Sequence, residues 1–242
     1  MTEPVRLSKR VATLTGCSRA QAEQYIEGGW VRVDGAVVEQ PQCRVGEAQK
    51  IEIDPAAKLQ AVEPATLLWH KPAGIEIVAG DSGIDPALVA AARHWSEDAS
   101  GVRPLQRHLQ RLTPLMPLDR DASGLLVLTQ DGRVWRRLTE DVALIEQEFV
   151  VDFTGELPGD ALGRLNAATT PWDRGAVGCK ASRQSDTRLR IVAKGASSAQ
   201  IAARCRAAGV VVDAVRRLRI GKVSLGKMPV GMWRYQPASE RF

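Results

Sequence analysis

The strongest chemical signal in this chain is a short polar loop that carries carboxylates and runs into an apolar segment. Residues 118–132 read Leu-Asp-Arg-Asp-Ala-Ser-Gly-Leu-Leu-Val-Leu-Thr-Gln-Asp-Gly, with Asp119 in the loop and an apolar stretch at 125–128. The apolar stretch predicts a buried strand. A carboxylate fixed at the end of such a strand can act on a ligand held over the sheet edge, as a nucleophile or as a general base.

Aspartates in polar turns also have a simpler role, because their side chains often cap backbone N–H groups. Asp131 directly precedes Gly132, and Asp121 lies within the tight loop. These two aspartates fit the capping role better than Asp119 does.

The spacing of Asp119, the Ser-Gly pair, the apolar stretch and the closing Asp-Gly resembles the signature of the pseudouridine synthases of the RsuA/RluB/RluE/RluF family. The resemblance implies that Asp119 is the catalytic residue. It also implies that an aromatic residue on the next strand, here Phe149, stacks on the substrate base. Without the resemblance, Phe149 reads as an ordinary core aromatic on the alternating strand at 146–153.

Membership of this family would imply one reaction. Pseudouridine formation breaks the N1–C1′ bond of a uridine, turns the base and forms a C5–C1′ bond, and this isomerisation requires no cofactor. A single carboxylate suffices in principle, through covalent attack on the sugar or base or through removal of a proton from the sugar. The sequence leaves both routes open. A base inside RNA structure must first be flipped into a pocket where flat side chains hold it.

The first part of the chain, residues 6–54, has a self-contained pattern of two helices, a hairpin and a strand. Ser18 and Gln21 have the spacing of a capping box at the start of the second helix, and Asp34-Gly35 predicts a two-residue hairpin turn. This order resembles the S4 RNA-binding module. The residues that the resemblance places on the RNA side are Arg6, Lys9, Arg10, Ser18, Arg19 and Arg32.

A small folded domain with exposed arginines is the alternative interpretation of this module. Up to residue 60, eight Lys/Arg are balanced by eight Asp/Glu. The module can therefore be basic on one face only.

The whole chain is expected to be an α+β protein. The pattern predicts an S4-like module at residues 1–57, a proline-bounded linker at 58–65 and a catalytic domain at 66–242. In the catalytic domain strands dominate and helices alternate irregularly with them, which predicts a mixed, largely antiparallel sheet. Residues 84–95 are expected to form one of these helices.

Positive charge is concentrated toward the end of the chain. The net charge is +5, but residues 180–227 hold twelve Lys/Arg against two acids and carry +10. Clustering on this scale favours a phosphate-facing surface over an ordinary solvated one. In the catalytic domain the residues expected to bind RNA are Lys71, Arg107, Arg111, Arg120 and Arg219.

Several other classes of protein are disfavoured. The four cysteines are scattered without a CxxC pair and the three histidines show no metal-ligand spacing, so we expect free thiols and no metal. Phosphate loops of the GxxxxGK[ST] or GxGxxG type are absent. No apolar run reaches the roughly 18 residues of a membrane span, and the N-terminus lacks an apolar signal core. We expect a cytoplasmic monomer whose partner is RNA, with ribosomal RNA as the first candidate and tRNA as the second.

The chain departs from the family's pattern at three positions. Pro117 and Gln147 stand where the family usually has Arg and Lys, and Ala202 stands where an Arg that pairs with the catalytic Asp is expected. Loss of such a partner removes an interaction that keeps a buried carboxylate ionised. The cations that could replace it from other positions are Arg120, Arg204 and Arg219.

These departures keep two hypotheses open. The first is a pseudouridine synthase that isomerises a uridine of structured RNA with Asp119. The alternative is an RNA-binding or ribosome-assembly factor that retains the synthase fold with a degenerate active site.

Overall fold

The computed structural model describes residues 3–78, 84–167 and 177–242. The chain forms two compact units, which are described separately here. The first comprises Met1–Pro64 together with Arg103–Gln110, and the second comprises Ala65–Val102 together with Arg111–Phe242. No helix of the described residues is long and apolar enough to cross a lipid bilayer.

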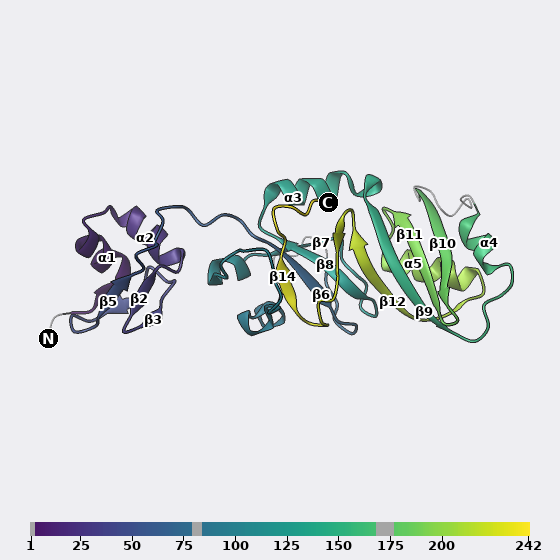
Figure 1. Cartoon of the computed structure of the whole chain (residues 1–242), viewed down its shortest axis with the longest axis horizontal. Helices are drawn as coiled ribbons and strands as arrows, with labels where there is room; N and C mark the ends of the chain where they lie inside the picture. Colours follow the sequence, from purple (N-terminus) through teal and green to yellow (C-terminus); the bar gives the residue numbers. More distant parts are fainter. Residues whose placement is uncertain (1–2, 79–83, 168–176) are drawn as a thin grey trace. The chain divides into compact units, whose positions relative to one another are not determined.

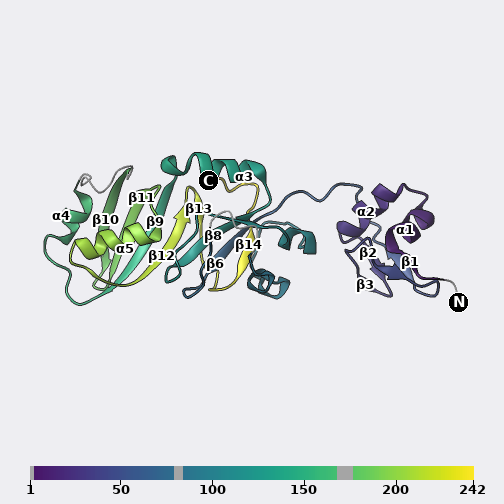
Figure 2. The same ribbon diagram turned by 180° about the vertical axis from the view of Figure 1, so that it is seen from behind.

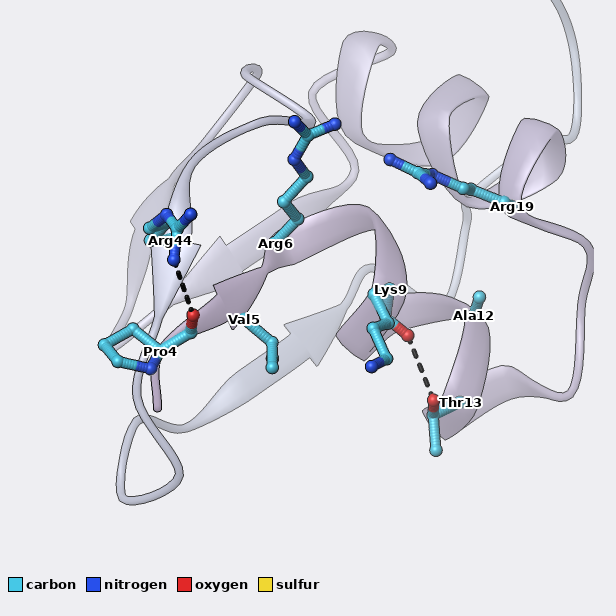
Figure 3. Close-up of a pocket in the computed structure, with 8 residues that line it drawn as sticks. All are labelled: Pro4, Val5, Arg6, Lys9, Ala12, Thr13, Arg19 and Arg44. Carbon is cyan, nitrogen blue, oxygen red and sulfur yellow. Dashed lines mark hydrogen bonds between the residues drawn. The ribbon is translucent and has the colours of Figure 1, made fainter. Parts of the chain in front are cut away.

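The first unit is a small α+β module with the expected order of elements. Its elements are β1 (Val5–Arg6), α1 (Leu7–Thr15), α2 (Arg19–Glu27), β2 (Val31–Val33), β3 (Ala36–Val37), β4 (Arg44–Val45) and β5 (Ile51–Ile53). Strands β3, β2 and β5 form one small sheet, and β1 pairs with β4. The Arg44 guanidinium, on β4, donates to the Pro4 carbonyl oxygen at 3.1 Å beside this pair (Figure 3).

Local sequence chemistry explains where these elements begin and turn. The Ser18 side chain accepts from the Gln21 amide, and the Gln21 side chain accepts from the Ser18 amide, which confirms the predicted capping box. Asp34 and Gly35 have φ angles of 51° and 84°, as the predicted two-residue hairpin turn requires. The core of the unit consists of Leu7, Val11, Ala22, Ile26, Val31, Val33 and Val45.

The segment Arg103–Gln110 belongs to the first unit, although its place in the sequence lies inside the region assigned to the catalytic domain. The Arg103 guanidinium donates to the Gly29 carbonyl at 2.7 Å and lies 4.2 Å from the centre of the Trp30 ring. Leu105 is buried, and the Gln106 amide donates to a Glu39 carboxylate oxygen at 2.6 Å. A cation on an aromatic face and a buried leucine attach this segment to the module.

The second unit is built on one large sheet, in which the strand order is β10-β11-β9-β12-β8-β6-β14, with β13 paired to β12 and β7 paired to β8 (Figure 1). The strands are β6 (Thr66–Lys71), β7 (Thr113–Leu115), β8 (Ser123–Thr129), β9 (Glu146–Thr154), β10 (Val177–Ser185), β11 (Arg188–Lys194), β12 (Val211–Ile220), β13 (Val223–Ser224) and β14 (Trp233–Tyr235). Among these pairs β12 and β8 run parallel and the others run antiparallel, which confirms the predicted mixed, largely antiparallel sheet.

Helices pack on this sheet through two apolar clusters. The helices of the unit are α3 (Gly132–Glu140), α4 (Ala161–Asn166) and α5 (Ser198–Ala207), with short 3-10 turns between strands. Figure 2 shows α5 in front of strands β9 and β11, where Ile201 and Cys205 pack against Phe149 and Ile191. Leu138 of α3 belongs to the second cluster, together with Leu68, Leu125, Val127 and Ile220.

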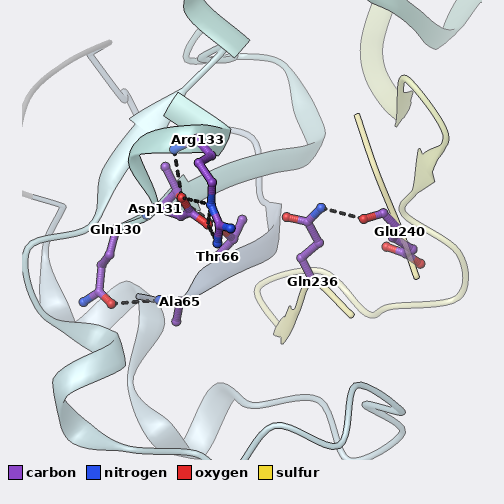
Figure 4. A network of polar contacts seen from close by, with 8 residues as sticks. Ala65, Thr66, Gln130, Asp131, Arg133, Gln236 and Glu240 are labelled. Atoms are coloured by element: carbon purple, nitrogen blue, oxygen red, sulfur yellow. Dashed lines mark hydrogen bonds and ion pairs between the residues drawn. The ribbon is translucent and has the colours of Figure 1, made fainter. Parts of the chain in front are cut away.

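The start of α3 confirms the capping role predicted for one aspartate. Asp131 is the N-cap residue, and its carboxylate accepts from the Arg133 amide at 2.8 Å and from the Arg133 guanidinium (Figure 4). Nearby, the Gln130 side chain accepts from the Ala65 amide at 3.1 Å, which ties the end of β8 to the start of β6.

The prediction of a helix at residues 84–95 is wrong. The structure has two short 3-10 turns, Pro86–Val89 and Ala91–Arg93, separated by Ala90 in an extended conformation (ψ 150°). The extended residue lets the Trp233 indole donate to the Ala90 carbonyl at 3.1 Å, and the Trp95 amide donates to the Trp233 carbonyl at 2.8 Å. Pairing with the edge strand β14 therefore replaces the helix.

Candidate active site

Asp119 lies in the loop between β7 and β8, against the first turn of α5. Its carboxylate oxygen Oδ2 accepts hydrogen bonds from the Ala199 amide at 2.6 Å and from the Ser198 hydroxyl. The Asp119 amide in turn donates to Ser198 Oγ at 3.0 Å. Asp119 is exposed, so the carboxylate is open to a ligand while one of its oxygens is held.

Lys71 supports the same loop from inside the sheet. It has no exposed surface, and its ammonium donates to the carbonyl oxygens of Pro72, Asp119, Arg120 and Ala122 at 2.8 to 3.2 Å. Burial lowers the pKa of Lys71 to about 8, although the charge of Asp119 acts in the opposite direction. A buried ammonium with four carbonyl partners fixes the loop backbone, and it leaves no donor for the RNA contact that the sequence predicted.

A buried arginine supplies positive charge near Asp119. Arg217 on β12 is 1% exposed, and its guanidinium donates to the Met116 and Leu125 carbonyls, which flank the loop, at 2.6 and 2.9 Å. Its third hydrogen bond goes to the Gln147 side-chain oxygen at 3.0 Å. Burial lowers the pKa of Arg217 to about 9, and the Asp119 charge raises it. The guanidinium thus stays charged at neutral pH and attracts the carboxylate through its charge.

Two of the three arginines proposed from the sequence as replacement cations have other partners. Arg204 donates to the carbonyls of Leu165 and Ala167 at 3.0 and 3.1 Å. Arg219 forms ion pairs with Glu146 and Glu148. Arg120 is exposed next to Asp119. The sequence missed Arg217, because an arginine on a strand carries no local signal that it turns inward.

Phe149, expected to stack on the substrate base, has no exposed surface. It belongs to the apolar cluster that also contains Leu118 and Ala122, the residues on either side of the Asp119 turn. The structure therefore places Phe149 beneath the loop as a core aromatic. A base could reach its ring only after the residues above it move apart.

The basic character of the region 180–227 is reduced by acids from β9. Arg188 pairs with Asp152 at 2.6 Å, Arg190 pairs with Glu148 at 2.8 Å, and Arg219 pairs with both Glu146 and Glu148. These acids lie outside the stretch in which the sequence showed an excess of cations. Three of the twelve cations are therefore matched by acids of the neighbouring strand β9, which lowers the positive charge that this region presents.

The first unit contains a basic pocket of about 510 Å³ between α1, α2 and the β1–β4 pair (Figure 3). Its lining includes four cations and no acid: Arg6, Lys9, Arg19 and Arg44. Arg6, Lys9 and Arg19 were expected on the RNA side, and Arg44 was missed, because it lies on a two-residue strand far from the helices in sequence.

The other residues expected to bind RNA lie elsewhere. The Ser18 side chain is used in the helix cap, and the guanidinium of Arg32 donates to the Gly35 carbonyl. Arg10 donates to the Glu47 carbonyl at 3.2 Å, and Arg107 pairs with Glu27. Arg111 is exposed and has a φ of 50°.

Comparison with known proteins finds a matching family for each of the two units. Residues 65–205 match the family described as RNA pseudouridylate synthase, and residues 5–51 match the S4 domain. The Escherichia coli (strain K12) dual-specificity RNA pseudouridine synthase RluF is 25% identical over 231 residues, which cover 95% of this chain and 74% of that protein.

Two further relatives extend the comparison. The Bacillus subtilis (strain 168) ribosomal large subunit pseudouridine synthase B is 32% identical over 160 residues, 66% of this chain and 60% of that protein. A crystal structure of a pseudouridylate synthase has a TM-score of 0.58 at 19% identity and covers 97% of both chains. This last similarity shows a shared fold.

Proposed function

The chain belongs to the RNA pseudouridylate synthase family, and from that premise we propose that it isomerises specific uridines of ribosomal RNA with Asp119 as its catalytic carboxylate. The proposal rests on the exposure of the Asp119 side chain and on the contacts that hold its loop. Asp119 is exposed in a loop that a buried lysine and a buried arginine hold in place, and one of its two carboxylate oxygens is fixed by α5.

The reaction requires two things of the protein: a positioned carboxylate and a binding site for the base. The uridine is flipped out of the RNA, its N1–C1′ bond breaks, the base turns, and C5 bonds to C1′. C5 then loses its proton and N1, freed from C1′, gains one, so substrate and product are isomers. Asp119 acts either by covalent attack on the sugar or base or by removing a sugar proton, and the buried cations Lys71 and Arg217 hold the loop that presents it.

The uracil is proposed to stack on Phe149. This ring lies in the cluster that supports Leu118 and Ala122, directly under the Asp119 turn. Stacking requires the side chains that cover the ring to move apart when the base enters, while the backbone contacts of the Asp119 loop are kept.

The first unit is proposed to bind the RNA backbone with its basic pocket. Four cations without a lining acid attract phosphate groups and give little base preference. We assign ribosomal RNA as the substrate because the Bacillus subtilis relative is named for the large ribosomal subunit. Transfer RNA is the second candidate.

We further propose that the protein works as a monomer in the cytoplasm. The four cysteines, all among the described residues, form no disulfide bond, which fits a reducing compartment. Light scattering tests the oligomeric state, and the expected mass is that of one 26.3 kDa chain.

The test is a pseudouridine map made by carbodiimide chemistry on RNA from a deletion strain. The strain is complemented with the wild-type gene or with Asp119→Asn. We expect one or a few ribosomal uridines that are modified only when the wild-type protein is present. If the Asp119→Asn protein restores the same sites, Asp119 is not the catalytic residue. If growth or ribosome assembly is restored without any site, the chain acts as an RNA-binding factor instead.

A further inference from the structure

Asp119 and Ser198 are 79 residues apart in the sequence, and two hydrogen bonds join them. Ser198 Oγ accepts from the Asp119 amide at 3.0 Å and donates to the Asp119 carboxylate. Ser198 is 2% exposed, so solvent does not compete for its hydroxyl. One hydroxyl therefore fixes both the backbone and the side chain of Asp119.

The carboxylate is held on one side only. Within the described residues, the hydrogen bonds to this carboxylate, from Ser198 and from the Ala199 amide, both fall on Oδ2. This leaves Oδ1 as the oxygen available to a ligand. A carboxylate held by one oxygen keeps a fixed direction, which is what attack on a single atom of a substrate requires.

The start of α5, which carries Ser198, has two sets of contacts of its own. Ser197 and Gln200 form a capping box that starts α5 directly before Ser198. The preceding residue, Ala196, accepts from the Gln147 side-chain amide at 3.0 Å. The start of α5 is thereby tied to strand β9.

The Gln147 side chain joins this helix start to the loop of Asp119. Its oxygen accepts from Arg217, whose other hydrogen bonds go to the Met116 and Leu125 carbonyls on the two flanks of the loop. Gln147 is 1% exposed and uses both ends of its amide. A side chain that must accept at one end and donate at the other has the chemistry of glutamine; a lysine would face the arginine with a like charge.

We propose that Ser198 is a positioning residue for Asp119 and that the Gln147–Arg217 pair keeps Ser198 aligned with it. The contacts form a closed ring that runs from Asp119 through Ser198, Ala196, Gln147 and Arg217 back to the flanks of the loop. Ser198 does not touch the substrate and acts through the direction of the carboxylate. The inference rests on the proposed catalytic role of Asp119.

The test measures tritium release from RNA labelled at C5 of uridine, with the RNA prepared from a strain that lacks the protein. The full-length wild type is compared with Ser198→Ala, Ser198→Thr and Ser197→Ala. Ser197→Ala is the matched control, because it weakens the same helix start without touching Asp119. Thermal unfolding of each variant checks that it is folded.

We expect Ser198→Ala to lower kcat about 10- to 100-fold while KM changes less than about twofold. Ser198→Thr keeps the hydroxyl and restores most of kcat, and Ser197→Ala stays within about threefold of the wild type. Equal losses in Ser198→Ala and Ser197→Ala, or an unchanged kcat in Ser198→Ala, would overturn the proposal.

A second variant tests the other half of the ring. Gln147→Glu keeps an acceptor for Arg217 but removes the donor to Ala196, and it should lower kcat with little change in KM. A wild-type kcat in this variant removes the Gln147–Arg217 pair from the proposal.

Asp119→Asn separates this inference from the proposed function. If Asp119→Asn is inactive and Ser198→Ala is fully active, the inference alone fails. If Asp119→Asn is fully active, or the wild type releases no tritium, the proposed function fails and the inference fails with it.

Discussion

Gly124 and Arg217 lie in register on neighbouring parallel strands, and their backbones approach so closely that no side chain fits between them. A β-carbon on Gly124 would lie 2.6 Å from the Arg217 amide nitrogen and nearer still to its carbonyl oxygen. Gly124 also has a φ of 113°, which residues with a side chain rarely adopt. The glycine of the Ser-Gly pair therefore has a structural purpose: it lets the strand after Asp119 sit against the strand that carries Arg217.

Gly124→Ala is predicted to destabilise the protein by about 3 kcal/mol, because the new methyl group must push two strand backbones apart. Urea unfolding followed by circular dichroism measures the change. Gly163→Ala is the control, since Gly163 is in α4 and a β-carbon there would meet no atom of another element within 4 Å, and it should be neutral or stabilising by about 0.5 kcal/mol. Equal stabilities of the two variants would contradict the close approach.

Lys71→Met is predicted to destabilise the protein by about 3 kcal/mol. It removes the donor that serves four carbonyl oxygens, three of them in the Asp119 loop, and leaves these partly or fully buried oxygens without that partner. Lys222→Met, at an exposed site, should change the free energy of unfolding by less than about 0.5 kcal/mol. If Lys71→Met is as stable as the wild type, the ammonium does not hold the loop.

Stability is predicted to fall as the pH drops below about 6.5. Burial lowers the pKa of His70 from its ordinary value of 6.5, and the charge of Arg216 lowers it further. The unfolded chain then binds a proton that the folded chain resists, so the stabilisation present above pH 6.5 is lost on acidification, at up to about 1.4 kcal/mol per pH unit. Burial shifts the pKa of His108 in the same direction.

His70→Gln isolates the first of these contributions. Urea unfolding between pH 7.5 and 5.5 should show a shallower loss of stability in this variant than in the wild type. Parallel curves for the two proteins would show that His70 binds its proton equally well in both states.

The basic pocket of the first unit is predicted to set the salt dependence of RNA binding. Arg44→Ala and Lys9→Ala should each weaken binding and reduce the slope of log affinity against log salt by about 0.7 to 0.9. Filter binding at several salt concentrations measures the slope. Arg188→Ala is the control, because Asp152 already pairs with this arginine, and an equal effect there would mean that net charge alone matters.

The sequence predicted the features that depend on a few neighbouring residues. The Ser18–Gln21 capping box, the Asp34-Gly35 turn and the Asp131 cap all follow from local hydrogen bonding, and the structure contains each of them. The family and the sheet were predictable for a related reason. The residues of the Asp119 signature stand together in the chain, and alternation along strands marks their buried faces.

Contacts between distant strands could not be predicted in the same way. Arg217 was counted among the cations expected to face phosphate, yet it is buried beneath the Asp119 loop. The Ser-x-x-Gln spacing at 197–200 marks the start of α5, but it does not indicate that Ser198 contacts Asp119. The acids that neutralise Arg188 and Arg190 lie on β9, some forty residues earlier. Register across a sheet decides these pairings.

We propose that Asp119, and no neighbouring acid, carries out the isomerisation. Asp121 provides the matched comparison, because it is an exposed aspartate of the same loop two residues away. Purified Asp119→Asn and Asp121→Asn are assayed for tritium release from C5-labelled RNA under single-turnover conditions. We expect a loss of at least about 1000-fold for Asp119→Asn and a change below about threefold for Asp121→Asn, if Asp119 is the catalytic residue. Full activity of Asp119→Asn, or an equal loss in both variants, would contradict it.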